Sequence, residues 1–352
     1  MEAAATGALI AFASLWGTLT RLGLSALNTY DGQSIAPIIW AQAVGCLVMG
    51  WMTYPRNKET MERWYKPAFT MVTTGYCGST TSYSTWVFGV FQAFSNNLHY
   101  NRHGLHNVMD ALTQTAATIG MSFAGFWAGR TLAGLVRLAY LEEALSRITR
   151  RSHGMPRIDT SSTLERGEKT QRTRYLHLAS IALGTVFWIG AILLCALYTP
   201  FRKVSFTLVL SPLGALARWQ LAKLNKPLGQ APLVWYSPRG WPVGTLTANL
   251  VAITILCVVY TAQYVGYETG PASRGAYTAN ACDALYAVQN GFCGTLSTIS
   301  TLIVELSLMR PPRAAFAHLF FSWAVGILIS ILLVGAPWWA LGMQGGCAAP
   351  VP

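Results

Sequence analysis

Nine apolar segments, each about as long as a membrane is thick, dominate this chain of 352 residues. A transmembrane helix needs about 20 mainly apolar residues. Segments of that kind lie near 7–27, 35–53, 68–93, 112–139, 176–198, 204–224, 241–262, 283–308 and 314–341. The composition agrees, because only 11% of the residues are charged, against about a quarter in a soluble domain. The sequence therefore predicts an all-α membrane protein with nine transmembrane helices.

The basic residues predict how the chain is oriented. The formal net charge is +12, but the charges are spread between the apolar segments without a nucleic-acid recognition motif, so no nucleic-acid partner is expected. If the N-terminus is inside, most Lys and Arg fall in inner loops, as the positive-inside rule requires. The largest group lies in RITRRSHGMPRIDTSSTLERGEKTQRTR, residues 147–174. Nine spans then place the N-terminus in the cytoplasm and the C-terminus outside.

The seven cysteines show no metal or redox pattern. They are scattered without CxxC spacing and without clustered histidines, so neither a zinc site nor a redox pair is predicted. Most are expected to be small residues that allow helices to pack closely.

The two ends of the chain repeat each other. GTLTRLGLSALN (17–28) aligns with GALARWQLAKLN (214–225), and the box GYCGSTTSYSTW (75–86) aligns with GFCGTLSTISTL (291–302). Each half has four spans in the same order, and the span at 176–198 is left over. One extra crossing turns the second half upside down, an arrangement typical of transport proteins. The predicted domains are residues 1–140, then 141–203 with a cytoplasmic linker (141–175) and the inverting helix, then 204–352.

The two boxes are poor helix formers. Two glycines and a group of Ser and Thr lower the helix propensity, and open backbone at membrane depth is tolerated only where it is buried or lines a polar cavity. One such box could simply permit close helix packing. Two copies in related halves favour a broken third helix in each repeat, with backbone carbonyls that coordinate an ion.

A few polar residues inside the spans are candidates for an anion pathway. Arg21 and Arg218 would lie toward the outer and inner mouths, where they attract anions or snorkel to the surface. Asn249 and Ser322 could replace part of an anion's hydration shell, and His318 is a structural residue or a secondary candidate. No nucleophile and base fall into a catalytic pattern, so an enzyme is not expected.

These motifs resemble the Fluc fluoride channels. Gly-x3-Arg in the first helix, an Asn in the second and GFCGTLSTIST in the third carry the resemblance. Two copies joined by a linking helix are similar to the fused eukaryotic form, the FEX fluoride exporters. The resemblance covers eight of the nine predicted spans in order. It implies an inverted pair of repeats that conducts fluoride passively around a central structural sodium ion.

The resemblance also implies roles for particular residues. By motif position, the carbonyls of Gly78, Thr81, Gly294 and Ser297 would bind the sodium ion. The pathway would use Asn249, Ser322, Tyr83, Trp86, Arg218 and Arg21. Secondary candidates are His318 and the hydroxyl residues of the boxes, Ser82, Thr85, Thr298, Ser300 and Thr301.

The first half departs from the family pattern at the positions of the amide and the hydroxyl. Gln42 stands where the second half has Asn249, and Ala116 aligns with Ser322. The second half departs at the aromatic positions, because Ile299 and Leu302 replace the phenylalanines that Tyr83 and Trp86 replace in the first half. A complete pore is then expected only once, in a chain that works as a monomer.

Three functions are consistent with this reading. The first is a passive channel in the plasma membrane, surrounded by lipid, that exports cytoplasmic fluoride. The second is a secondary transporter that exchanges a small anion or metabolite by alternating access. The third is a structural membrane protein that conducts nothing, although arginine and asparagine inside spans argue against it.

Overall fold

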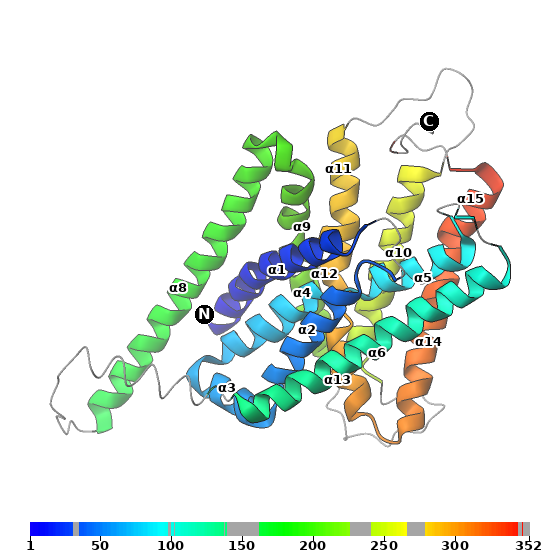
Figure 1. Ribbon diagram of the computed structural model, residues 1–352. Helices are drawn as coiled ribbons and strands as arrows, with labels where there is room; N and C mark the ends of the chain where they lie inside the picture. The colour runs from blue at the N-terminus through cyan, green and yellow to red at the C-terminus, as the bar shows by residue number, and fades with distance from the viewer. Residues whose placement is uncertain are drawn as a thin grey trace.

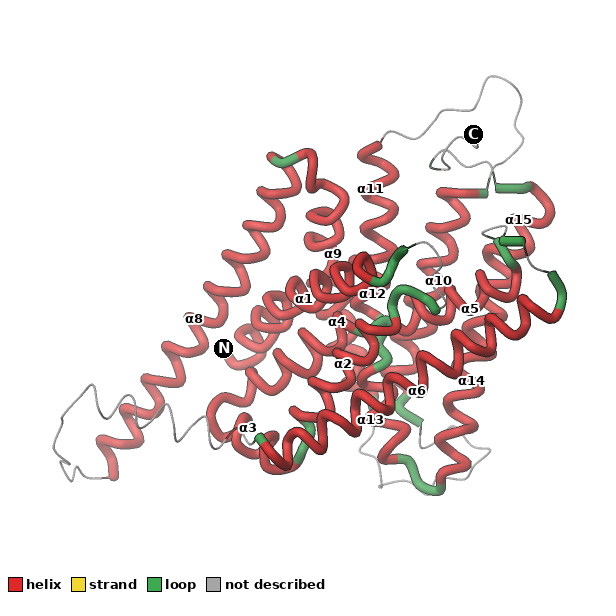
Figure 2. The backbone as a smooth tube through the Cα atoms, in the orientation of Figure 1, coloured by secondary structure: helices red, strands yellow, loops and turns green. Residues whose placement is uncertain are grey.

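The computed structural model describes residues 1–30, 35–97, 100–101, 103–136, 138, 162–225, 241–265, 279–343 and 347. Helices make up all the regular structure of these residues, and they form one bundle (Figures 1 and 2). Within the described ranges, five helical stretches are long and apolar enough to cross a membrane: Glu2–Leu27, Gln171–Leu197, Val243–Tyr264, Ala279–Leu308 and Pro312–Leu341. The predicted all-α membrane architecture is confirmed at this level.

The first half runs from the N-terminus to residue 135. Its elements are α1 (Glu2–Leu27), α2 (Ile39–Met52), α3 (Pro55–Thr70), the π-helical segment η1 (Met71–Cys77), α4 (Gly78–Thr80), α5 (Tyr83–Ser95) and α6 (Leu105–Leu135). The short helix α4 and the segments on either side of it correspond to the first glycine and hydroxyl box.

The second half has the same order of elements. It contains η2 (Thr199–Phe201), α9 (Arg202–Leu221), η3 (Ala222–Leu224), α10 (Val243–Tyr264), α11 (Ala279–Ala287), η5 (Val288–Cys293), α12 (Gly294–Leu296), α13 (Ser300–Leu308), α14 (Pro312–Ser330), η6 (Ile331–Gly335) and α15 (Ala336–Leu341). The short helices α4 and α12 pack against each other in the middle of the bundle (Figure 1).

The helix α8 (Ser162–Leu197) connects the halves. It lies along one side of the bundle and packs on α1 and α9, the first helix of each half (Figure 1). It begins at Ser162, whereas the sequence predicts a linker as far as residue 175. The part of the predicted linker between 141 and 161 lies outside the described residues.

Glycines let the first helix of each half touch its own box. A Cβ atom at Gly17 of α1 would lie 2.5 Å from the carbonyl oxygen of Tyr76, and one at Gly214 of α9 would collide with that of Phe292. Any larger residue would push the first helix away from the centre. The glycine of each Gly-x3-Arg motif is therefore required by packing.

The fourth helices of the two halves are packed differently. Along α6, Gly125 and Gly129 approach the backbone of α2 so closely that a Cβ atom would collide with the carbonyls of Ala43 and Leu47. The helix α14 packs much less along α10 and also contacts α5 of the first half. The repeat is therefore symmetric at the boxes and asymmetric at the fourth helix.

Candidate functional site

Both boxes interrupt their helix at the same position. After α4, Thr81 (φ −96°, ψ 147°) and Ser82 (φ −142°, ψ 117°) are extended, and helix resumes at Tyr83. After α12, Ser297 (φ −86°, ψ 157°) is extended, and helix resumes at Ser300. Ser and Thr hydroxyls favour such exits because they can hydrogen-bond to nearby backbone in place of the helical partner.

Each interruption caps the restarted helix of the other half. The amide of Ser300, at the start of α13, donates to Oγ1 of Thr81 over 3.1 Å. The amide of Ser84, near the start of α5, donates to Oγ of Ser297 over 3.0 Å. Unpaired amides at a helix start need such acceptors. The two halves therefore complete each other's helices at the centre of the protein.

An amide side chain from the second helix of each half supports each interruption. Asn249 of α10 donates to the carbonyl oxygen of Thr298 (3.3 Å) and accepts from its amide (2.8 Å). Gln42 of α2 makes the same pair of contacts with Ser82, at 2.8 and 3.2 Å. The predicted pathway residue Asn249 thus has a counterpart in Gln42, in spite of the different side chain.

The two buried arginines cross to the opposite half. Arg218 of α9 donates to the carbonyl oxygens of Thr74 (2.5 Å) and Gly78 (2.5 Å), and Arg21 of α1 donates to that of Asn290. A Cβ atom on Gly78 would collide with Arg218. One at Gly294 would collide with Arg21 in the same way. The second glycine of each box therefore makes room for the guanidinium group of the other half.

Carbonyl oxygens from both halves converge on a positive charge. Nη1 of Arg218 lies 2.5 Å from the carbonyl oxygen of Gly78 and 3.3 Å from that of Ser297. These are two of the four carbonyls that, by the resemblance to the Fluc channels, are expected to bind sodium. Oxygen ligands of this kind suit a hard cation, and the guanidinium shows that a cation fits between them. A sodium ion bound to the same two oxygens would have to share them with Arg218.

Tyr83 and Trp86 lie in a buried cluster with the residues that replace them in the second half. The Tyr83 hydroxyl donates to the carbonyl oxygen of Ser322 over 2.5 Å, and its ring meets that of Trp86 edge-on, 5.8 Å between centroids. We call the buried residues Tyr83, Trp86, Phe126, Ile299 and Leu302 the aromatic cluster. Trp241 and Trp323 pack against it.

The buried face of α14 carries a polar stripe. His318, Ser322, Gly326 and Ser330 follow each other at intervals of four residues, and all four are buried. A Cβ atom at Gly326 would lie 2.9 Å from the Tyr83 hydroxyl. Ser322 donates its own hydroxyl to the carbonyl oxygen of His318 over 2.7 Å. The aromatic cluster and this stripe therefore meet at Tyr83.

The alignment of Ala116 with Ser322 is wrong. Ala116 is exposed, and the buried polar residues of α6 are Gln114, Thr118 and Ser122. That alignment assumes that α6 and α14 pack alike, but the two helices pack differently, so the register does not transfer. The first half does carry hydroxyls on the buried face of its fourth helix.

A cavity of about 1100 Å³ opens beside the first interruption. Its walls include Arg21, Thr85, Asp110, Gln114 and Asn290. Thr85 lies next to Ser82, with 2.9 Å between their hydroxyl oxygens. Arg21 therefore lines a cavity, whereas the guanidinium of Arg218 is held on carbonyls in the interior. Thr301 follows Ser300 on α13 and is half-buried.

A buried polar group around Glu305 is not among the functional residues predicted from the sequence. The Thr245 hydroxyl donates to Oε1 of the buried Glu305 over 2.5 Å, and Nδ2 of Asn225 donates to the same oxygen over 3.3 Å. These residues lie on α10, α13 and the end of the α9 region. The signal in the sequence that could have indicated this group is Glu305, the single carboxylate in the apolar segment STLIVELSL.

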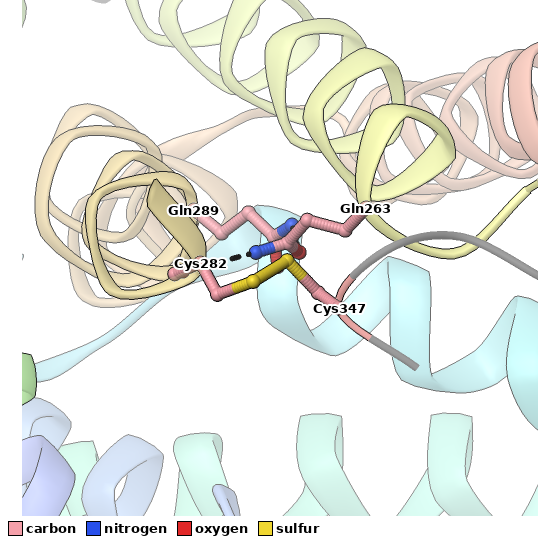
Figure 3. The surroundings of a disulfide bond; sticks show 4 residues. All are labelled: Gln263, Cys282, Gln289 and Cys347. Carbon is pink, nitrogen blue, oxygen red and sulfur yellow. Dashed lines mark hydrogen bonds between the residues drawn. A yellow bond between two sulfur atoms is a disulfide. The ribbon is translucent and has the colours of Figure 1, made fainter. Parts of the chain in front are cut away.

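A disulfide joins two of the seven cysteines. Cys282 on α11 is bonded to Cys347, 65 positions away, beside Gln263 and Gln289 (Figure 3). Cys282 lies near the start of α11, at the top of the bundle in the view of Figure 1. The other five cysteines are free and buried, as expected of packing residues. The bridge has no signature in the sequence, because its partners share no local spacing.

The fold and the interlocked interruptions define a multi-pass helical membrane protein built from two related halves. The profile of the CrcB-like protein family (camphor resistance, CrcB) matches residues 8–130 and again residues 205–336. The chain belongs to this family and contains two copies of its domain. No solved structure gives a significant match.

Curated relatives align with nearly the whole chain. Fluoride export protein 1 of Schizosaccharomyces pombe is 31% identical over 94% of this chain and 95% of its own length. Fluoride export protein 1 of Candida albicans is 26% identical over 95% of this chain and 80% of its own length. The fluoride-specific ion channel FluC of Thermococcus onnurineus is 34% identical over 35% of this chain and 84% of its own length. The FluC channel thus aligns with about a third of this chain.

Proposed function

We propose that this protein is a passive, selective fluoride channel that exports cytoplasmic fluoride. The observation that carries the proposal is the pair of interlocked interruptions, which places buried hydroxyls and amides at the centre of a chain that aligns along its length with fluoride export proteins. Transport of this kind needs no catalytic group. The membrane potential, negative inside, would drive the anion outward.

The proposed topology has nine spans and two inverted repeats. The positive-inside rule puts the N-terminus in the cytoplasm and the C-terminus outside, in the plasma membrane. The bridge between Cys282 and Cys347 supports this orientation, because disulfides persist on the oxidising side of a membrane. In this topology α8 is the inverting helix, and one chain in lipid is the working unit.

The proposed pathway follows the buried face of α14. Ser322 and Tyr83 meet there, and Asn249 holds the neighbouring interruption. Fluoride is tightly hydrated, so a selective path must replace its lost water with hydrogen-bond donors. Arg21 in the cavity beside the first interruption would raise the local concentration of anions.

A single pore is favoured by the difference between the fourth helices. α14 packs on α10 and also on α5 of the first half, whereas α6 packs mainly on α2. The aromatic residues that contact α14, Tyr83 and Trp86, come from the first half, and the second half has Ile299 and Leu302 in their place. The path beside α14 therefore brings the ring of Tyr83 together with Ser322, whose carbonyl oxygen accepts from the Tyr83 hydroxyl.

A central sodium ion is part of the proposal. The carbonyls of Gly78, Thr81, Gly294 and Ser297 would hold it, and it would compensate their partial negative charge. Sodium and the Arg218 guanidinium would both be attracted to the oxygens of Gly78 and Ser297.

Fluoride efflux from liposomes tests the function. Purified protein is reconstituted into vesicles loaded with potassium fluoride. Valinomycin lets potassium leave and so balances the charge of the departing fluoride, and a fluoride electrode measures the fluoride concentration outside. We expect rapid efflux without a counter-substrate, and no comparable efflux of chloride. Efflux that requires an exchanged ion or metabolite would instead support a secondary transporter, and vesicles that stay closed to fluoride would contradict both.

A further inference from the structure

Three tryptophans around the aromatic cluster bury an indole N–H that has no acceptor. They are Trp86 on α5, Trp241 just before α10 and Trp323 on α14. Within the described part of the chain, no hydrogen-bond partner lies near Nε1 of any of them. An indole nitrogen can only donate. What is missing in all three places is therefore an acceptor.

The same fold provides acceptors for indoles elsewhere. Nε1 of Trp51 donates to the carbonyl oxygen of Val136 and Nε1 of Trp188 to that of Val209, each over 3.0 Å. A buried donor without a partner costs free energy, and native proteins contain few. Three in one cluster indicate an acceptor that the described residues do not supply.

A histidine adds a fourth unpaired donor. His318 is 0% exposed, and among the described residues neither ring nitrogen has a partner. Its ring meets that of Trp241 edge-on, with 4.9 Å between centroids. A neutral imidazole carries one N–H. Unpaired donors thus lie beside both partners of the hydrogen bond between Tyr83 and Ser322: Trp86 beside Tyr83, and His318 beside Ser322. Both partners belong to the proposed pathway.

The missing acceptor must be small and must bring no donor of its own. The neighbouring side chains are packed, so a large ligand does not fit among Tyr83, Trp86 and Leu302, each at most 1% exposed. Indole N–H groups are neutral, so they can replace water around an anion without trapping it with a fixed charge, as conduction requires. Dehydrated fluoride meets both conditions.

We propose that the indole N–H groups of Trp86, Trp241 and Trp323 donate hydrogen bonds to fluoride as it passes along α14. This inference rests on the proposed function. It assigns Trp241 and Trp323 to the pathway, and it gives Trp86 a hydrogen bond in addition to its ring edge.

The indole region of a ¹⁵N–¹H NMR spectrum tests the hydrogen bonds. Full-length protein is titrated with sodium fluoride and, separately, with sodium chloride, and single Trp→Phe variants assign the resonances. We expect the signals of Trp86, Trp241 and Trp323 to move with fluoride and to stay in place with chloride. The signals of Trp51 and Trp188 should stay in place with both, because these indoles already have carbonyl partners.

Efflux from liposomes provides a second readout. W86F, W241F and W323F keep an aromatic ring and remove the N–H, and each should lower fluoride efflux several-fold. W51F and W188F are matched controls that should conduct like the wild type. If water alone satisfies the three donors, their signals ignore fluoride and the three variants conduct normally, which would overturn the inference and leave the channel intact. A wild type that does not conduct would contradict the proposed function itself.

Discussion

Arg218 reaches across the protein to Gly78, the second glycine of the opposite box. Its Nη1 atom donates to the Gly78 carbonyl oxygen over 2.5 Å, and a Cβ atom at that glycine would collide with the guanidinium group. A Cβ atom at Gly294 would likewise collide with Arg21, which donates to the carbonyl oxygen of Asn290. The arginine of one motif and the glycine of the other are therefore a matched pair, which neither half contains by itself.

Gly78→Ala should destabilise the protein. The new methyl group displaces Arg218 from its buried carbonyls, and a buried charged donor left without partners costs about 1–3 kcal/mol or more. We expect a lower Tm and a strong loss of fluoride efflux. Gly23→Ala on α1 is the control, because nothing lies within 4 Å of a Cβ atom there. Equal Tm values for both variants would show that the contact with Arg218 is unimportant.

Thr81→Val should weaken the contact between the halves. The variant keeps the shape of the side chain but removes the oxygen that accepts from the Ser300 amide. Loss of an N-cap costs about 0.5–2 kcal/mol, measurable as a fall in Tm. Thr113→Val is a suitable control, since the Thr113 hydroxyl bonds only to Met109 of its own helix. A larger fall in the control would argue against the reciprocal caps.

Asn249→Asp should abolish efflux, while Gln42→Ala should be mild for conduction. The carboxylate of the aspartate cannot donate to the Thr298 carbonyl oxygen that Asn249 now binds, and it puts a negative charge beside the anion path. Gln42→Ala loses two hydrogen bonds to Ser82, so its rate must be normalised to folded protein. Equal loss of efflux in both variants would exclude a single pore beside α14.

Sodium should raise the Tm. Replacing sodium by N-methyl-D-glucamine, which is too large for a site between carbonyls, removes the proposed central ion. We expect a lower Tm in the wild type and a larger sodium effect in Arg218→Gln, in which the charged competitor for the oxygens of Gly78 and Ser297 is gone. If neither protein responds to sodium, the proposed ion site is refuted.

Cys282→Ser should expose a thiol at the outer surface. The change leaves Cys347 without its partner, and a membrane-impermeant maleimide added to intact cells should then label it. The wild type is the control, because its other cysteines are buried. Labelling only after the cells are opened would place this end of the protein in the cytoplasm and reverse the proposed orientation.

The elements and their order could be predicted because the signals are local. Apolar length places the helices, and paired Gly, Ser and Thr place the interruptions at Thr81 and Ser297. These features depend on residues that are close together in the sequence. The start of α8 at Ser162 was missed because its first turns are polar.

The partners across the halves could not be predicted in the same way. Nothing near Ser84 in the sequence indicates that its amide binds Ser297, which lies 213 positions away. Ala116 was aligned with Ser322 on the assumption that both fourth helices pack alike, and the structure breaks that symmetry. The bridge from Cys282 to Cys347 depends in the same way on where two distant segments meet.

The reciprocal caps also bear on why a single gene would encode both halves. Thr81 accepts from the start of α13, and Ser297 accepts from the start of α5. Two separate polypeptides would have to be made in equal amounts, and any excess copy would keep unpaired amides inside the membrane. Fusion through α8 fixes the stoichiometry at one to one, so that the sequence of each half can diverge to fit the other half of the same chain.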